Sequence, residues 1–479
     1  MKKLLLSVIL FAGFKSIAQK APVDLVNRYA QIITPASLKE KLSVIASREM
    51  EGRETASPGQ KKAAAFIENY FHKLGLLPGT TGGYQMQYPI YQDTLLEASL
   101  KVNGQLQKLD TTFSLNIQSA ANGNYEIKEV IFASYGIVDS VRNDYQDLDV
   151  KGKWVLIVEG TPGSPTAVAD RRSPYSIHSK VEQATKLGAK GVFVMSKEFP
   201  QKKSEAKGNM YLKKQAQVYV PAITVSADVA NKILGLNPLQ PLQSIKIIPT
   251  GAYNTEVTFT INKRTLLLQS SNVLALLPGT DKAEEYVLVT GHYDHLGTRG
   301  KDIYYGADDD GSGTTGVLAL AEAFAKARNE GHSPRRSIVF MTVSGEEKGL
   351  LGSEFYSEHP AYPLNKTSVD LNIDMVGRID PKYKGDSLNY IYVIGDDKLS
   401  TELQPITDSV NKAYMKMQLD RRFNDLQDPN RYYYRSDHYN FAKNGVPDVK
   451  LISSTGSASF RNLDVVANCS SLHFVLKRF

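Results

Sequence analysis

The sequence predicts an α/β protein whose mostly parallel sheet is flanked by helices and interrupted by a small inserted domain. Its 479 residues are 42% hydrophobic and 22% charged, an ordinary globular composition that excludes a disordered or fibrous chain. Nearly continuous apolar runs, such as those at 286–290 and 337–343, are typical of strands buried on both faces. Helical segments separate these runs, and this alternation favours a parallel sheet.

The first residues are typical of a secretory signal peptide over residues 1–18. Lys2 and Lys3 precede an apolar run, and the small residues Ser16 and Ala18 stand where a signal peptidase would read them. The alternative is a first core helix. No later stretch approaches the roughly 20 apolar residues of a membrane helix. We therefore expect an exported protein, periplasmic or extracellular, without a membrane span.

The charge and the cysteine content exclude several classes of partner and site. The formal net charge is +7, and three of the positive charges lie within residues 1–18, so no basic block remains to favour nucleic acid. The single cysteine, Cys469, excludes an intramolecular disulfide and a Cys-rich zinc site. Any metal would have to be bound by His, Asp and Glu.

Residues 19–118 are expected to form the N-terminal part of the main domain. Apolar residues recur at helical spacing in 37–46 and 59–74, with a polar loop at 50–55 between these two helices. From about residue 84 to 115 the pattern changes to short alternating runs, which indicate strands.

Residues 119–255 are expected to be the inserted domain. The segment contains several apolar runs that read as strands and one helical stretch, an order that indicates a small mixed α/β lobe. It shows no catalytic grouping. The predicted strands are 130–133, 153–158, 191–195 and 220–225, and the predicted helix is 180–187.

Residues 256–479 are expected to carry the chemistry. Predicted strands at 286–290, 337–343, 369–374 and 390–394 alternate with predicted helices at 315–327 and 399–413. In such sheets, sites form at the carboxyl ends of the strands.

His292 and Asp294 follow the first of these strands and are two residues apart, so they share one face of an extended chain. Asp294 is placed to orient the imidazole of His292, as metal-bound histidines require. A lone pair of this kind is also common as a satisfied surface pair.

Carboxylates follow the other strands. Asp308, Asp309 and Asp310 directly precede a helix, and either they cap it or one of them bridges two cations. Glu346 and Glu347 follow a buried strand, where a solvated face is harder to achieve, and Asp374 ends the next strand. Together with imidazole, these hard ligands suit zinc, and cobalt or manganese less specifically. Two such metals could activate a water and hold both oxygens of a hydrolytic transition state.

The stretches GHYDHLG, GADDDGSGT, SGEEKGLLGSE and NIDMVGR resemble those of the co-catalytic zinc aminopeptidases of the aminopeptidase Y and bacterial secreted leucyl aminopeptidase type. Their superfamily includes the glutamate carboxypeptidases and transferrin receptor. The resemblance extends to EGRETASPGQ upstream and YRSDHYNFAKNGVP downstream. The insert, with DVKGKWVLIVEG and VPAITVS, is similar to a protease-associated domain.

The resemblance implies a zinc-peptidase-like fold and a role for each matching residue. His292 and Asp374 would bind one zinc, Glu347 the other, and Asp309 would bridge both. Glu346 would be the general base, and Asp294 would orient His292. The resemblance also implies a cis peptide between Asp309 and Asp310.

The chain departs from the family after Pro447. The family's fifth metal ligand is a histidine in a C-terminal loop that is followed by a helix, and neither is present in the atypical tail from residue 448. His473 is the only histidine in that tail. We interpret His438 as a structural or supporting residue rather than a replacement ligand. The sequence leaves open whether the tail is truncated, frameshifted or divergent.

The motifs therefore predict an exported zinc exopeptidase, an aminopeptidase acting on peptides with a free N-terminus. One alternative is a non-catalytic binding protein on the same scaffold. Another is a carboxypeptidase for acidic peptides, which would need a basic pocket that Arg378, Arg421, Arg422 and Arg435 could supply.

Overall fold

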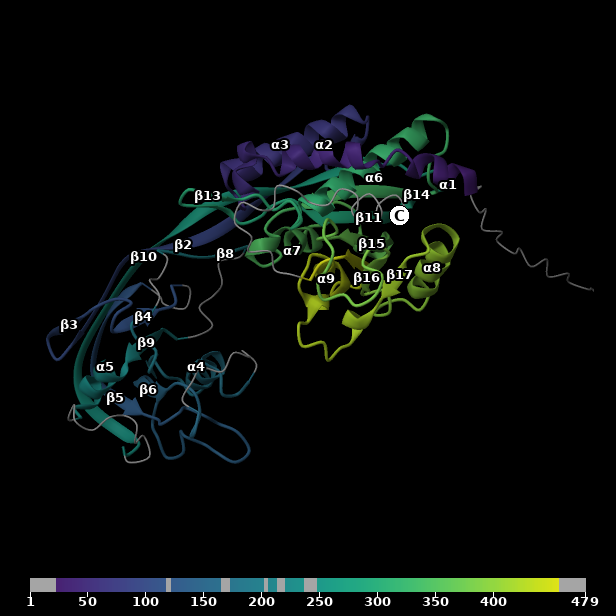
Figure 1. Ribbon diagram of the computed structural model, residues 1–479. Helices are drawn as coiled ribbons and strands as arrows, with labels where there is room; N and C mark the ends of the chain where they lie inside the picture. Colours follow the sequence, from purple (N-terminus) through teal and green to yellow (C-terminus); the bar gives the residue numbers. More distant parts are fainter. Residues whose placement is uncertain are drawn as a thin grey trace, which may run out of the picture. The chain divides into compact units, whose positions relative to one another are not determined.

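The computed structural model describes residues 23–117, 122–164, 173–201, 206–212, 220–236 and 248–455. The predicted signal peptide, Cys469 and His473 lie outside these described residues. The chain divides into two compact units. Unit 1 comprises Met1–Met86 and Ser271–Phe479, and unit 2 comprises Gln87–Ser270 (Figure 1).

Unit 1 is built on a sheet in the order β17-β16-β18-β15-β11-β14-β10. Strand β11 pairs in parallel with both β14 and β15, and β15 pairs in parallel with β18, whereas the outer strand β10 runs antiparallel to β14. The predicted fold class is therefore confirmed. The strands of unit 1 are β1 (Leu77–Pro78), β11 (Lys282–His292), β12 (Gly297–Arg299), β13 (Asp302–Tyr304), β14 (Arg336–Val343), β15 (Thr367–Ile373), β16 (Tyr390–Ile394), β17 (Gln418–Asp420) and β18 (Asp448–Ile452), with the end of β10 (Gly251–Leu277).

Alternate residues of the central strands pack on opposite faces of this sheet. Val289 and Phe340 join a core with helices α3 and α6, whereas Leu288 and Val339 join a second core with α7 and α9. The apolar runs are therefore continuous because both faces are covered. The helices of unit 1 are α1 (Val23–Ala30), α2 (Pro35–Ile45), α3 (Pro58–Lys73), α6 (Gly311–Asn329), α7 (Leu351–Glu358), α8 (Leu403–Val410) and α9 (His438–Ala442).

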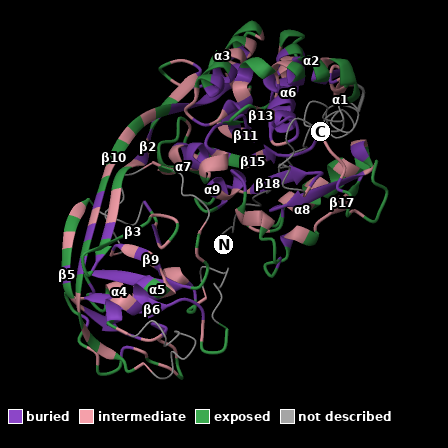
Figure 2. Cartoon of the chain, turned by 60° about the vertical axis from the view of Figure 1, so that its left-hand side comes forward, coloured by how far each residue is buried: buried purple, intermediate pink, exposed green. Residues whose placement is uncertain are grey.

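The strand order in unit 2 is β10-β5-β6-β7-β9-β4. Strands β5, β6, β7 and β9 pair in parallel, and the buried residues of β6 and β7 form the centre of this unit (Figure 2). The elements of unit 2 are β2 (Gln85–Val102), β3 (Gln105–Gln107), β4 (Phe113–Leu115), β5 (Gly123–Phe132), β6 (Trp154–Val158), α4 (Ile177–Lys186), β7 (Gly191–Ser196), β8 (Lys207–Tyr211), β9 (Ala222–Ser226) and α5 (Ala227–Leu234).

The structure differs from the predicted elements in four places. The region predicted as short runs from 84 to 115 begins with one 18-residue strand, β2. Strand β10 extends over 27 residues, and Val257, Phe259 and Ile261 keep one face apolar over part of its length. The predicted helix 399–413 is shorter, since α8 ends at Val410 and a wider turn follows. The polar loop 50–55 is largely a buried 3₁₀ turn.

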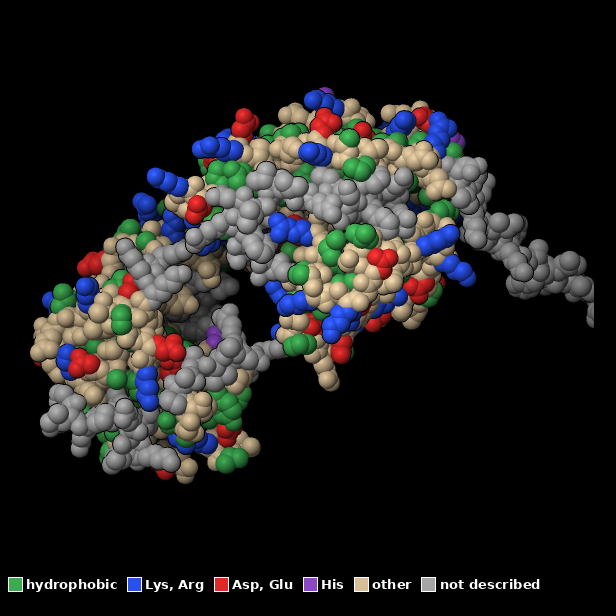
Figure 3. All heavy atoms as spheres, viewed as in Figure 1, with side chains coloured by type: hydrophobic (Ala, Val, Ile, Leu, Met, Phe, Trp, Pro, Cys, Tyr) green, Lys and Arg blue, Asp and Glu red, His purple; other side chains and the backbone are tan. Residues whose placement is uncertain are grey.

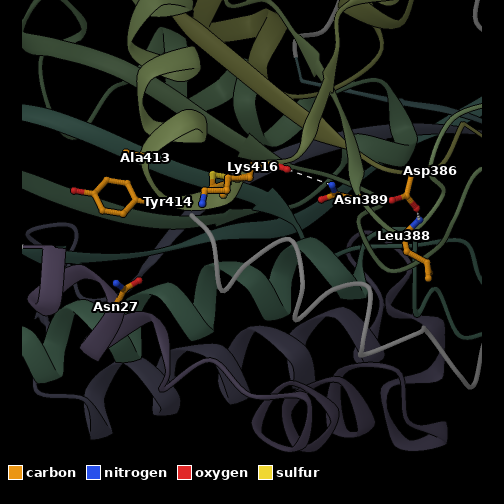
Figure 4. A pocket seen from close by; sticks show the side chains of 8 residues that line it. Asn27, Asp386, Leu388, Asn389, Ala413, Tyr414 and Lys416 are labelled. Atoms are coloured by element: carbon orange, nitrogen blue, oxygen red, sulfur yellow. Dashed lines mark hydrogen bonds between the residues drawn. The ribbon is translucent and has the colours of Figure 1, made fainter.

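The surface offers few further features among the described residues. None of their helices has the length and apolar content needed to cross a bilayer. On the face seen in Figure 3, basic side chains lie among acidic and neutral ones. Figure 4 shows a pocket in unit 1 whose side chains include no histidine and only one carboxylate. The pocket is lined by Asn27, Asp386, Leu388, Asn389, Ala413, Tyr414, Met415 and Lys416.

Candidate metal centre

The carboxyl ends of three adjacent strands deliver the predicted site residues to one edge of the unit 1 sheet. His292 is the last residue of β11, Glu346 follows β14, and Asp374 follows β15. Since β14, β11 and β15 are parallel neighbours, their ends meet. Asp309 lies in the loop that leads into α6, which packs on the same strands.

A first group of potential ligands surrounds the imidazole of His292. Its Nε2 atom lies 3.1 Å from Oδ1 of Asp309 and 3.9 Å from Oδ1 of Asp374. Oε2 of Glu346 is also 3.9 Å from this nitrogen. Ligand atoms of His292, Glu346 and Asp374 all lie within 4.8 Å of one another, close enough to share one ion.

A second group lies beside it and includes a residue that the sequence did not predict. Ligand atoms of His295, Asp309 and Glu347 lie within 4.8 Å of one another. Nδ1 of His295 is 2.8 Å from Oε1 of Glu347. Because Asp309 belongs to this group and also contacts His292, it stands where a bridging carboxylate would stand.

The three consecutive aspartates divide their roles. Asp310 accepts hydrogen bonds from the N–H groups of Gly313, Met375 and His292, so it caps helix α6 and ties it to two strand ends. Asp308 accepts a hydrogen bond from Gly377 N–H. Only Asp309 is left to face the two groups.

The capping alternative is therefore confirmed for Asp310, and the bridging role of Asp309 stays a prediction. The peptide between Asp309 and Asp310 is cis, as the resemblance implies. Burial raises the pKa of Asp308 to about 7 and that of Asp310 well above its usual range.

Asp294 supports His292, mainly through its main chain. Nδ1 of His292 lies 3.1 Å from the main-chain oxygen of Asp294 and 3.7 Å from its carboxylate. When Nδ1 carries the proton and donates a hydrogen bond to this oxygen, the lone pair of Nε2 is left for a metal. The Asp294 carboxylate accepts hydrogen bonds from the Thr55 hydroxyl and the Glu346 N–H, so it links three loops of the site.

The packing of charges shifts the pKa of several site residues. Burial raises the pKa of Glu346 well above its usual range. Nearby carboxylates raise it further, because they add to the cost of ionising Glu346. Burial alone would lower the pKa of His292, but the carboxylates of Glu346, Asp294 and Asp309 raise it well above the usual value. Several carboxylates thus compete for little positive charge, a condition that a metal cation would relieve.

The two carboxylate oxygens of Asp374 differ in their hydrogen bonding. Its Oδ2 atom accepts hydrogen bonds from the Ser436 hydroxyl at 2.7 Å and from the Lys450 ammonium at 2.8 Å. Its Oδ1 atom, which points to His292, has no hydrogen-bond partner among the described residues. Although burial opposes ionisation, the charges of Lys450 and His292 lower the pKa of Asp374 to about 2.

Arg53 holds the His292–His295 segment and the loop before α6 in place. This fully buried guanidinium donates hydrogen bonds to the main-chain oxygens of Tyr293, Tyr305, Gly306 and Ile45. Its own carbonyl accepts a hydrogen bond from His295 N–H. Burial lowers the pKa of Arg53 to about 10, so at neutral pH it keeps its positive charge.

The residues present fit a zinc centre. Buried groups of the site that lack hydrogen-bond partners among the described residues are Oδ1 of Asp374, Oε1 of Glu347 and both ring nitrogens of His295. Unpaired buried polar atoms are costly, and a set of them converging on one place indicates a missing ligand. Imidazole nitrogens and carboxylate oxygens are the ligands of catalytic zinc sites that use no cysteine.

Two family models match this chain. Residues 272–468 match peptidase family M28, and residues 125–233 match the PA domain. The M28 segment contains every predicted metal ligand, and the PA segment lies within the insert expected at 119–255.

Curated relatives share only part of their length with this chain. A vacuolar membrane protease from Aspergillus clavatus is 35% identical over 124 residues, which are 23% of this chain and 12% of that protein. A probable zinc metalloprotease from Pyrenophora tritici-repentis is 38% identical over 117 residues, 22% of each. The chain thus matches less than a quarter of the length of either relative.

Solved structures with this fold are similar over nearly the whole chain. An aminopeptidase from Aneurinibacillus sp. strain AM-1 has a TM-score of 0.57 at 17% identity, covering 95% of this chain and 94% of that one. A zinc aminopeptidase from Bacillus subtilis has a TM-score of 0.52 at 18% identity, covering 93% and 94%. At such identities the likeness establishes the fold.

The structure brings all six predicted site residues together, and it adds three that the sequence analysis missed. His295 follows His292 by three residues at the same strand end, a signal that was available in the sequence. Arg53 lies in the segment predicted as a polar loop, and no role was predicted for it. Lys450 lies in the atypical tail, in the fully buried strand β18, and reaches Asp374 only through the fold.

Proposed function

We propose that this chain is a zinc-dependent aminopeptidase that removes N-terminal residues from peptides. The observation that carries the proposal is the pair of adjoining imidazole–carboxylate groups that share Asp309, with Glu346 beside them. This arrangement has the ligands of a hydrolytic metal centre and a carboxylate free to move a proton.

His292, Asp309, Glu347 and Asp374 would hold two zinc ions. Zinc at such a site supplies Lewis acidity, which polarises the scissile carbonyl and lowers the pKa of the attacking water toward about 7. Glu346 takes the proton from that water and delivers it to the leaving amine. Asp294 and Arg53 hold the loops of the site in place through hydrogen bonds, so that the charged groups are preorganised for the reaction.

The alternatives have less support. Arg421 is ion-paired with Asp396 and Asp408, and Arg422 with Asp420, so neither is left to recognise an acidic C-terminus. Arg435 lies over the ring of Tyr432. A purely binding role would not require a glutamate at the position of Glu346. Export remains part of the proposal, on the evidence of residues 1–18.

Three classes of substrate separate these functions. The zinc-loaded full chain should release p-nitroaniline from leucyl- and alanyl-p-nitroanilides, and it should not release it from their N-acetylated forms. An N-acylated dipeptide ending in a free glutamate should stay intact. Cleavage of that dipeptide alone would indicate the carboxypeptidase, and metal binding without turnover of any of the three would indicate the binding protein.

A further inference from the structure

His295 and His438 are buried histidines outside the predicted ligand set whose ring nitrogens lack hydrogen-bond partners among the described residues, but of the two only His295 belongs to a group of potential metal ligands. The His295 side chain is 2% exposed. A buried imidazole in this condition forfeits hydrogen bonds that it would make in water. Its surroundings should therefore contain a ligand for it.

The ring is aimed at the second group. Nδ1 lies 2.8 Å from Oε1 of Glu347, and that oxygen also has no hydrogen-bond partner among the described residues. Two ligands of a tetrahedral zinc are about 3.3 Å apart when each bond is about 2.0–2.2 Å long. The pair lies somewhat closer than this, so a small separation of the two groups would let them share one ion, with Asp309 as the third ligand.

The main chain keeps His295 in this position. Its N–H donates to Arg53 O, and the Arg53 side chain binds the carbonyl of Gly306, the residue that packs against the imidazole ring. The segment is therefore fixed before any ion arrives, which reduces the entropic cost of binding.

We propose that His295 is the imidazole ligand of the second metal position, together with Asp309 and Glu347. This assignment rests on the proposed function of the site as a two-metal centre. It completes that position from residues 295–347 alone, so the tail beyond residue 447 need not supply a histidine. A catalytic zinc site has three protein ligands and leaves the fourth coordination position open for water or substrate.

The test is zinc stoichiometry at a fixed free zinc concentration, measured by mass spectrometry of the dialysed full chain. The wild type and His473→Ala should hold two zinc ions per chain. His295→Ala should hold one, with affinity for the second reduced by roughly 100-fold or more, since even residues that only support a ligand contribute 10–100-fold. His438→Ala is the matched control, because it also removes a buried imidazole, and it should keep both ions.

Retention of the second zinc by His295→Ala, or its loss from His473→Ala, would overturn the proposal. If His295→Ala does not fold, X-ray absorption of the zinc-loaded His473→Ala protein decides. About one imidazole per zinc supports His295, and about half an imidazole per zinc refutes it.

These readouts are independent of turnover. An active aminopeptidase whose His295→Ala variant keeps two ions would refute the ligand and leave the proposed function standing. An inactive wild type that binds two ions through His295 would refute the function and leave the ligand standing.

Discussion

In both units, buried polar residues follow the ends of parallel strands. The hydrogen bonding of these residues differs between the two units. In unit 2, Glu159 follows β6 and accepts a hydrogen bond from Ser196 at the end of β7, while the nearby Lys180 ammonium donates to the carbonyls of Val158 and Gly160. In unit 1, His295, Glu347 and Asp374 follow strand ends and have buried atoms without a hydrogen-bond partner in the described part of the chain. Hydrogen-bond completion, rather than burial or charge, separates the structural cluster from the candidate metal centre.

The largest expected effect concerns Glu346. Glu346→Gln keeps the shape of the side chain but removes its ability to accept a proton, so kcat should fall by about 10²–10⁴-fold. Zinc content should stay at the wild-type value. The exposed Glu402→Gln is the control and should retain full activity. Steady-state kinetics on leucyl-p-nitroanilide measure the effect. Unchanged activity of Glu346→Gln would show that Glu346 is not the general base.

The next effect concerns Lys450, the buried partner of Asp374. Lys450→Met leaves a buried carboxylate without its cation, which should destabilise the metal-free protein by about 3–5 kcal/mol. Zinc would restore positive charge beside Asp374, so the increase in Tm on adding zinc should be larger than in the wild type. Thermal unfolding with a chelator and with zinc measures both values. Equal destabilisation in the two conditions would mean that Asp374 faces no metal.

Lys180 of unit 2 should respond to pH and not to zinc. Burial lowers its pKa from 10.5 to about 8 in the folded protein. Between these values the unfolded chain binds more protons than the folded one, so the folded state gains stability as pH rises. Relative to Lys180→Met, the free energy of unfolding of the wild type should rise by up to about 3 kcal/mol across this window.

Urea unfolding of the Lys180→Met and wild-type proteins at pH 7.5, 9 and 10.5, with and without zinc, tests this expectation. A zinc-dependent difference between the two proteins would show that the comparison of the two units is wrong.

The smallest expected effect concerns Arg53. Arg53→Lys keeps the charge but cannot reproduce a planar guanidinium that serves four carbonyls, and at least one buried oxygen would lose its partner. The expected cost is about 1–3 kcal/mol. Zinc affinity should fall with it, because the loop carrying His295 is held by this residue. Calorimetric titration of zinc into Arg53→Lys would show unchanged affinity if Arg53 acts on stability alone.

The sequence was most informative where the chemistry is local. The apolar strands and the acidic loops after them were predictable because each signal lies within a few residues of its strand. Lys450 was not predictable, since its partner Asp374 is reached only when β18 pairs with β15. The role of Arg53 was not predictable either, because this buried side chain donates to main-chain carbonyls of residues far from it in the sequence. The 27-residue strand β10 was missed because its alternation is interrupted by polar residues on both faces.

Gly306 shows how a centre of this kind limits the substitutions that a chain tolerates. Its φ is +56°, and a β-carbon there would lie 2.5 Å from the His295 ring and from Asp309 O. A Cβ at Gly313 would collide with Ile373 O and the Asp310 carboxylate. In a saturation library, both positions should accept glycine alone, although neither offers a reactive group. A screen scored by catalysis would list them beside Glu346, and only a screen scored by folding without zinc would set them apart.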